Sequence, residues 1–351
     1  MSEVNQQVIA DRLGLSRATV SRCFTNHAGI SAATRAKVFE LAAEIGYVHL
    51  ENRSPSARKT KKNVNFTVLI CSEKEEYFKG DYQSPGAQIL EGVAEYGQLH
   101  KSRVDVSFIS PDATDLNHPS FHGVPGLKDR KDRGILLIYP FHKDIVQKLS
   151  LHFPLVSLVD QQQHALIDCV DVDHYSGISA SIEHLIAAGH ERIGFSTRDY
   201  AVSASWSFRR YSAFLEKMAR LKMKIRPEDI IGIHPRTFES TAANLAAAAQ
   251  QTRDGVTAWV CAADHQAFDM IHAFQKLGIK IPSEVSVTGF DGIQRSHSDP
   301  KLSTIQIPFR AIGMTGAERL ASRIHKRFGG AQHIYISGEL NKGETVAAPQ
   351  K

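Results

Sequence analysis

The pattern of apolar and polar positions predicts three short helices at the start of the chain. The first spans residues 6–13 and is ended by Gly14, the second spans 17–24, and the third spans 32–45 and is ended by Gly46. The three helices lie close together in sequence, and a glycine-containing turn separates the first two. That arrangement is typical of a helix-turn-helix domain.

Capping residues and apolar stripes support these three helices. Ser16 and Ser31 each stand directly before a predicted helix, where a side-chain oxygen satisfies a free backbone N–H. The apolar positions of the third helix recur at helical spacing, so one face is expected to be buried. These positions are Val38, Leu41, Ala42 and Ile45.

After a linker at residues 48–63, strand-like apolar runs alternate with amphipathic helices almost to the end of the chain. Such alternation predicts parallel sheets covered by helices, with ligand sites at the carboxyl ends of the strands. The predicted strands are 66–71, 104–109, 134–139, 155–160, 192–196, 258–262 and 285–290. The clearest predicted helices are 86–100, 177–188, 207–221, 240–251 and 267–277.

The positive charge of the chain is concentrated near its beginning. The 351 residues carry a formal charge of +5, and residues 1–62 hold ten Lys/Arg against five Asp/Glu, which is also +5. The remaining chain has 32 basic and 32 acidic residues and is neutral. We therefore expect the first part to face nucleic-acid phosphates. Its basic residues are Arg12, Arg17, Arg22, Arg35, Lys37, Arg53, Arg58, Lys59, Lys61 and Lys62.

Several functional classes are disfavoured by what the sequence lacks. It has no run of 18 apolar residues and no apolar signal at its start, which predicts a cytoplasmic protein. The four cysteines form no C-x-x-C pair and the histidines are scattered, so neither a disulfide nor a metal site is expected. No G-x-S-x-G, P-loop or G-x-G-x-x-G motif is present, and we expect neither a cofactor nor enzymatic activity.

The motifs together resemble the lactose-repressor (LacI/GalR) family. VIADRLGLSRATVSRCF and SAATRAKVFELAAEIGY are similar to its headpiece, and EHLIAAGHERIGF, AADHQAFDM, VSVTGFDGI and DPKLSTIQIPFRAIG to its effector domain. The resemblance implies an all-α headpiece (1–47), a basic hinge (48–63) and an α/β effector domain (64–351) with the two-lobed periplasmic-binding-protein fold. Three strands would cross between an N-lobe, 64–171 with 300–329, and a C-lobe, 172–299 with 330–351.

The second helix is the predicted DNA-reading element. Helical spacing places Arg17, Ala18, Ser21 and Arg22 on one outward face. The resemblance implies base readout by Arg17, Ala18 and Arg22, since arginine pairs with guanine and alanine contacts a thymine methyl. The alternative is that both arginines are solvated helix charges. Hydroxyl side chains suited to phosphate contacts are Ser16, Thr19, Ser21 and Thr34.

The hinge departs from the family pattern. Relatives continue with "P-N-x-x-A-R-x-L", whose leucine wedges into the minor groove, whereas this chain reads HLENRSPSARKT without that leucine and with Pro55. Arg53, Arg58 and Lys59 are instead suited to phosphates or a narrow minor groove. We therefore predict less operator bending than the family pattern implies.

The effector site is predicted at strand ends of both lobes. Asp264 matches the family's interlobe aspartate, which accepts hydrogen bonds from ligand hydroxyls; its alternative role is to cap the helix starting near Gln266. Ser207 stands where the family has a clamping arginine, and Arg236 where it has a stacking aromatic. Trp206 is suited to stack on a ligand and Arg236 to hold an anionic group, the alternatives being core and surface roles. Tyr82, Gln83 and Ser84 are N-lobe candidates by position.

These observations predict a ligand-controlled repressor. A homodimer would bind double-stranded DNA at a near-palindromic operator, with a sugar or sugar derivative as effector. The alternative is a sugar-binding transport receptor of the same effector fold. The basic headpiece favours the repressor.

Overall fold

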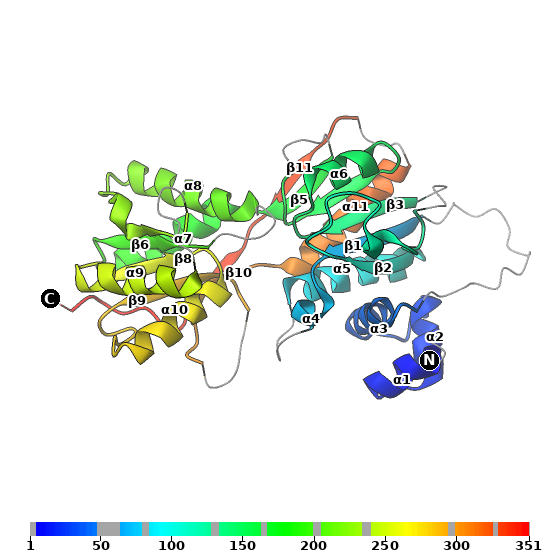
Figure 1. Cartoon of the computed structure of the whole chain (residues 1–351), viewed down its shortest axis with the longest axis horizontal. Coiled ribbons are helices and arrows are strands. Elements are labelled where there is room, and N and C mark those ends of the chain that lie inside the picture. The colour runs from blue at the N-terminus through cyan, green and yellow to red at the C-terminus, as the bar shows by residue number, and fades with distance from the viewer. Residues whose placement is uncertain are drawn as a thin grey trace, which may run out of the picture. The chain divides into compact units, whose positions relative to one another are not determined.

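The computed structural model describes residues 5–47, 64–78, 84–127, 133–162, 167–198, 205–233, 240–293, 299–325 and 329–350. The chain forms two compact units (Figure 1). The first unit comprises Met1–Asp171 with Phe309–Ile334, and the second comprises Val172–Pro308 with Tyr335–Lys351.

The three helices of the headpiece have the predicted spans: α1 Gln6–Leu13, α2 Arg17–Phe24 and α3 Ala32–Ile45. The Oδ1 atom of Asn5 caps α1 by accepting a hydrogen bond from the backbone N–H of Gln7, at 2.9 Å. Helices α1 and α3 both end at glycines with positive φ, 62° at Gly14 and 74° at Gly46, a conformation that costs glycine little. These local signals explain why the headpiece was predictable.

The headpiece core is formed by one face of each helix. Ile9 of α1, Val20 and Cys23 of α2, and Val38 and Ala42 of α3 are all buried. Burial of each larger aliphatic side chain contributes roughly 1.5–3 kcal/mol to the stability of the fold. Together these side chains hold the three short helices against one another. The outward face of α2 is thereby fixed relative to α1 and α3.

The remainder of the first unit is a parallel sheet with the strand order β11-β5-β4-β3-β1-β2. Its elements are β1 Asn65–Cys71, α4 Lys74–Tyr77, α5 Pro85–His100, β2 Arg103–Ile109, η1 Pro119–Phe121, β3 Arg133–Ile138, α6 Lys143–Ser150, β4 Leu155–Leu158, β5 Asp168–Val172, α11 Phe309–Ile324 and β11 His333–Ile336. All residues of β3 and the middle of β1 are buried. Near-continuous apolar strands of this kind are typical of a sheet covered on both faces.

Helices cover both faces of this first sheet. Ile135 and Leu137 of β3 belong to the same apolar cluster as Ile145 of α6. Residue 134 of β3 faces the other way, where a Cβ on Gly134 would come within 2.6 Å of Leu320 of α11.

Helices α5 and α11 approach each other through glycines. A Cβ on Gly92 of α5 would lie 2.0 Å from the carbonyl oxygen of Arg310, and one on Gly313 of α11 would lie 2.0 Å from that of Ile89. Any larger residue at either position would therefore force the two helices apart.

The second unit contains a sheet of order β12-β10-β9-β8-β6-β7, parallel except for the β10–β12 pair. Its elements are α7 His174–Ala187, β6 Ile193–Ser196, α8 Ser205–Arg220, η2 Pro227–Asp229, β7 Ile230–Ile231, α9 Thr241–Arg253, β8 Ala258–Cys261, α10 Asp264–Lys276, β9 Ser286–Asp291, β10 Ser303–Gln306 and β12 Glu339–Asn341. Trp259, Phe274 and Val287 are completely buried in its core. Of the helices in the described ranges, none is both long and apolar enough to cross a membrane.

Two of the three chain crossings differ from the predicted positions. The first falls after residue 171, as expected, but the second follows residue 308 rather than 299. Strand β10 pairs with β9 and β12, and this pairing keeps it in the second unit. The third follows residue 334 rather than 329, because β11 pairs with β5 in the first sheet.

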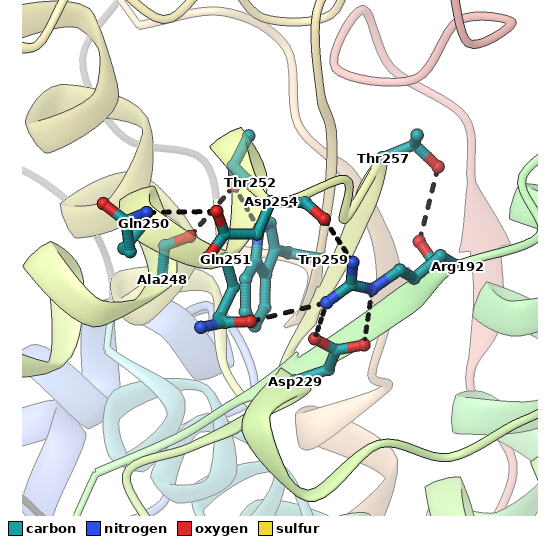
Figure 2. Close-up of polar contacts among 9 residues, drawn as sticks. All are labelled: Arg192, Asp229, Ala248, Gln250, Gln251, Thr252, Asp254, Thr257 and Trp259. Atoms are coloured by element: carbon teal, nitrogen blue, oxygen red, sulfur yellow. Dashed lines mark hydrogen bonds and ion pairs between the residues drawn. The ribbon is translucent and has the colours of Figure 1, made fainter.

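A polar cluster stabilises the amino-terminal edge of the second sheet (Figure 2). Arg192, just before β6, donates two hydrogen bonds to Asp229, of 2.8 and 2.7 Å, and others to the carbonyl oxygen of Asp254 and the side chain of Gln251. His190 bonds to Thr257 and Ser286 at the same edge. Because these groups satisfy one another, this edge is structural, and the opposite, carboxyl-terminal edge is the place to seek a ligand site.

Candidate functional site

Helix α2 presents the predicted reading side chains on one exposed face. Arg17, Ala18 and Arg22 are exposed, whereas Val20 and Cys23 of the same helix are buried. Three side chains are thus free to contact base edges while the other face anchors the helix to the headpiece core.

Three of the four predicted phosphate-contacting hydroxyls, those of Ser16, Thr19 and Thr34, lie at helix starts. The Ser16 side chain accepts a hydrogen bond from the Thr19 backbone N–H at 3.0 Å, and the two hydroxyl oxygens lie 2.9 Å apart. Ser31 and Thr34 repeat this arrangement at the start of α3, with oxygens 2.8 Å apart. In each pair one hydroxyl donates its proton to the other and the second hydroxyl keeps a proton, so each pair remains chemically able to bind phosphate. Ser21 is partly buried on α2.

One basic residue of the headpiece does not face phosphates. Arg35 of α3 has no exposed surface, which corrects its inclusion among the phosphate-facing charges. Its guanidinium group donates hydrogen bonds to the carbonyl oxygens of Cys23 and His27, the latter at 3.0 Å. The signal for this burial was present in the sequence, since residue 35 shares the helical stripe of Val38 and Ala42.

Some predicted contacts lie outside the described residues. These are Arg53, Arg58 and Lys59 of the hinge and Tyr82, Gln83 and Arg236 of the effector domain. Ser84 is described: it caps α5, where its oxygen accepts a hydrogen bond from the Ala87 N–H at 3.2 Å.

Asp264 lies at the carboxyl-terminal edge of the second sheet and is almost completely buried. One carboxyl oxygen accepts a 2.5 Å hydrogen bond from the Thr304 hydroxyl, and the other a 2.6 Å bond from the Ile293 N–H. The capping role is wrong, because α10 begins at Asp264 itself and is preceded by Ala263 without a side-chain cap. Burial and the nearby Asp291 raise the pKa of Asp264.

Arg210 of α8 occupies the same edge and was not among the predicted site residues. Its guanidinium carbon lies 3.9 Å from the centre of the Phe290 ring and 4.7 Å from that of Trp206. It also pairs with Asp291 at 3.1 Å and donates a hydrogen bond to the carbonyl oxygen of Ala262. One face of Trp206 is therefore occupied by an internal cation, which limits how a ligand can stack there.

Two further features mark this edge. Asp291 has φ of 137°, a strained conformation for a residue with a side chain, and such strain often accompanies functional sites. Ser207 is buried, and its hydroxyl lies 2.8 Å from that of Thr197. The structure thus brings together Ser207, Trp206 and Asp264 around the carboxyl ends of β6, β8 and β9. In the part of the chain that is described, no group of three or more His, Cys, Asp or Glu side chains is placed to hold a metal ion.

Two family models match the chain. Residues 7–49 match the bacterial regulatory proteins of the lacI family, and residues 182–346 match a periplasmic binding protein-like domain. The chain is 25% identical over 369 residues to the transcriptional regulator MalR of Streptomyces coelicolor, which covers 97% of this chain and 96% of MalR. It is 26% identical over 321 residues to the ribose operon repressor of Haemophilus influenzae, covering 90% of each.

Solved structures share the fold over the whole chain. The lac repressor dimer bound to operator and an anti-inducer superposes with a TM-score of 0.66 at 21% identity, covering 99% of this chain and all of that one. The complex of the regulator CelR with cellobiose gives 0.67 at 20% identity, covering 98% of this chain and all of CelR.

A basic headpiece that matches the lacI-family bacterial regulatory proteins, followed by two α/β units, is the architecture of a DNA-binding transcriptional regulator. The chain carries a lacI-family DNA-binding domain followed by a periplasmic binding protein-like domain, and over nearly its whole length it is similar to regulators of the LacI family.

Proposed function

We propose that this protein represses transcription by binding a near-palindromic operator as a homodimer. The observation that carries the proposal is the exposed face of α2, where Arg17, Ala18 and Arg22 are free to contact bases. Ser16, Thr19, Ser21 and Thr34 would position the headpiece on phosphates. The relatives support the assembly, since one structural neighbour is a lac repressor dimer bound to operator. A cytoplasmic location follows from this function.

The hinge, residues 48–63, would add sequence-independent affinity. Arg53, Arg58 and Lys59 would neutralise phosphates or enter a narrow minor groove, where negative potential attracts cations. Without the intercalating leucine of the family pattern, the operator centre would be bent less. A gel-mobility bend assay that showed a large central kink would contradict this part of the proposal.

The effector is proposed to be a sugar or sugar derivative that contacts Trp206, Ser207 and Asp264 of the second unit. Structural neighbours were solved with cellobiose, glucose and ribose. Because both Asp264 oxygens already accept internal hydrogen bonds, a ligand hydroxyl would have to use their remaining lone pairs. Arg236, also in the second unit, would favour an effector with an acidic group, and Tyr82, Gln83 and Ser84 of the first unit remain effector-binding candidates by position.

A thermal-shift screen tests the effector class. We expect a sugar or sugar acid from a panel containing ribose, glucose, cellobiose, sugar acids and purines to stabilise the protein, by ~2.7 kcal/mol at a hundredfold excess over its dissociation constant. Replacing Trp206 by leucine should weaken that stabilisation, whereas replacing the exposed Phe208 of the same helix should not. Stabilisation by a purine alone would contradict the sugar class.

Deleting residues 1–62 separates the repressor from a sugar-binding receptor. We expect the shortened chain to lose DNA binding in an anisotropy titration while it keeps the thermal stabilisation by the same sugar. Equal DNA affinity of the full and shortened chains, with sugar binding intact in both, would favour the sugar-binding receptor.

A further inference from the structure

We infer that Arg35 is a positioning residue for DNA recognition, which holds the last turn of α2 and thereby the backbone of Arg22. The inference rests on the proposed function and deepens it. Arg35 itself touches no DNA, because its side chain has no exposed surface. It acts from α3 on the helix that carries the reading side chains.

The contacts of Arg35 converge on the carboxyl end of α2. One guanidinium nitrogen, Nη1, donates to the carbonyl oxygen of Cys23 and lies 3.4 Å from that of Arg22 and 3.4 Å from Oδ1 of Asn26. The other terminal nitrogen, Nη2, donates to the carbonyl oxygen of His27 at 3.0 Å. One planar group thus ties together the final turn of the helix and the turn that follows it.

The charge of Arg35 is compensated without a carboxylate. Among the described residues, its polar partners are backbone carbonyl oxygens and the Asn26 amide oxygen, at a helix end whose dipole favours a cation. Burial lowers the pKa of Arg35, because its hydrogen bonds offset only part of the cost of removing the charge from water. Burying a cation in this way is costly. Helices α1 and α3 end at Gly14 and Gly46 without a buried cation.

The two ends of α2 are therefore held by different side-chain contacts. Ser16 caps the start, near Arg17, whereas Arg35 holds the end, at Arg22. If the last turn loosens, the Arg22 side chain no longer meets a base edge at a fixed position, but the phosphate-binding hydroxyls at the start of α2 stay in place. Loss of Arg35 should consequently lower sequence discrimination more than general DNA affinity.

The test uses the full chain with Arg35→Lys, which keeps the charge but cannot form the planar set of contacts. Dissociation constants are measured at one salt concentration for a duplex selected from a random library by the wild-type protein and for a scrambled duplex. We expect at least a tenfold fall in the ratio of the two constants, with the scrambled-duplex affinity and its salt dependence within twofold of wild type. Lys37→Gln, at an exposed position of the same helix, should leave the ratio unchanged.

A second variant keeps the test decisive if Arg35→Lys unfolds the headpiece. Asn26→Gly removes the amide oxygen and suits the positive φ of 55°, so we expect a smaller fall of the ratio in a folded protein. An unchanged ratio in a folded variant, or an equal loss of affinity for both duplexes, would overturn the inference. If the wild-type protein itself fails to distinguish the duplexes, the proposed function fails instead.

Discussion

Replacing Arg22 by alanine is expected to cost about 1–3 kcal/mol of specific DNA affinity, the value of one good arginine–guanine contact. Arg22 is exposed on the face of α2 shared with Arg17 and Ala18. The loss should be confined to the selected duplex, because binding to a scrambled duplex depends on phosphates rather than on base edges. Fluorescence anisotropy titrations at one salt concentration measure both affinities.

Arg12→Ala is the matched control for Arg22→Ala. Arg12 is an exposed arginine of α1 that lies 3.5 Å from Glu44, and pairs of this kind contribute little to stability. We expect this variant to bind the selected and scrambled duplexes in the wild-type ratio. If Arg22→Ala also kept that ratio, α2 would not read bases through Arg22.

Replacing Asp168 by asparagine is expected to lower the free energy of unfolding by about 3–5 kcal/mol, as for other broken buried ion pairs. Asp168, at the start of β5, is completely buried and accepts hydrogen bonds from Arg319 at 2.7 Å and from Arg323 at 2.5 Å. It also accepts one from the Gln332 N–H at 2.6 Å. The variant would leave two guanidinium groups without their shared carboxylate where α11 and β11 join the first unit.

The contribution of Asp168 should depend on pH in a defined direction. Burial alone would raise the pKa of its carboxyl, but hydrogen bonds from Arg323, Arg319 and Gln332 outweigh burial and hold the pKa below its usual value. A carboxyl with a lowered pKa stabilises the fold above its unfolded pKa, about 3.9, and loses that effect as the pH falls through the folded value. The difference between wild type and Asp168→Asn should thus be constant near neutral pH and shrink in acid.

Urea unfolding of wild type and Asp168→Asn at neutral pH and in acid measures this contribution. Asp144→Asn, in the first turn of α6 with half of its side chain exposed, serves as the control and should change stability by less than about 1 kcal/mol. A cost for Asp168→Asn no larger than that of the control would show that the two arginines are equally well satisfied without the carboxylate.

The sequence predicted the headpiece, four strands of the first sheet and three of the second because their signals are local. Capping serines, glycines after the helices and buried apolar runs each act within a few residues, and α1, α2 and α3 have the expected spans. Strands β5, β7, β10, β11 and β12 were not predicted. Each has at most five residues, and the place of β10 and β12 depends on pairing between segments far apart in the chain. The second and third chain crossings differ from their predicted positions for the same reason, since the pairing of β10 and β11 sets them.

Helical spacing predicted which side chains of α2 point outward, but not what lies inside. Periodicity shows that residue 35 faces inward. It does not show that its guanidinium group donates hydrogen bonds to the carbonyl oxygens of Cys23 in α2 and of His27 in the turn after it. Likewise, the motif around Asp264 indicates an edge of the sheet, whereas its partner Thr304 lies 40 residues away. Arg210 of α8 was missed because its partners, Phe290 and Asp291, lie on strand β9, far from it in the sequence.

The full chain is proposed to recognise a DNA sequence through its headpiece. The direct measurement is a selection from a random duplex library, followed by titration of the selected and a scrambled duplex at physiological salt. We predict a near-palindromic selected sequence bound at least a thousandfold more tightly than the scrambled one, the lower end for specific DNA-binding proteins. Equal affinity for the two duplexes, varying only with salt, would show that the headpiece does not read a DNA sequence.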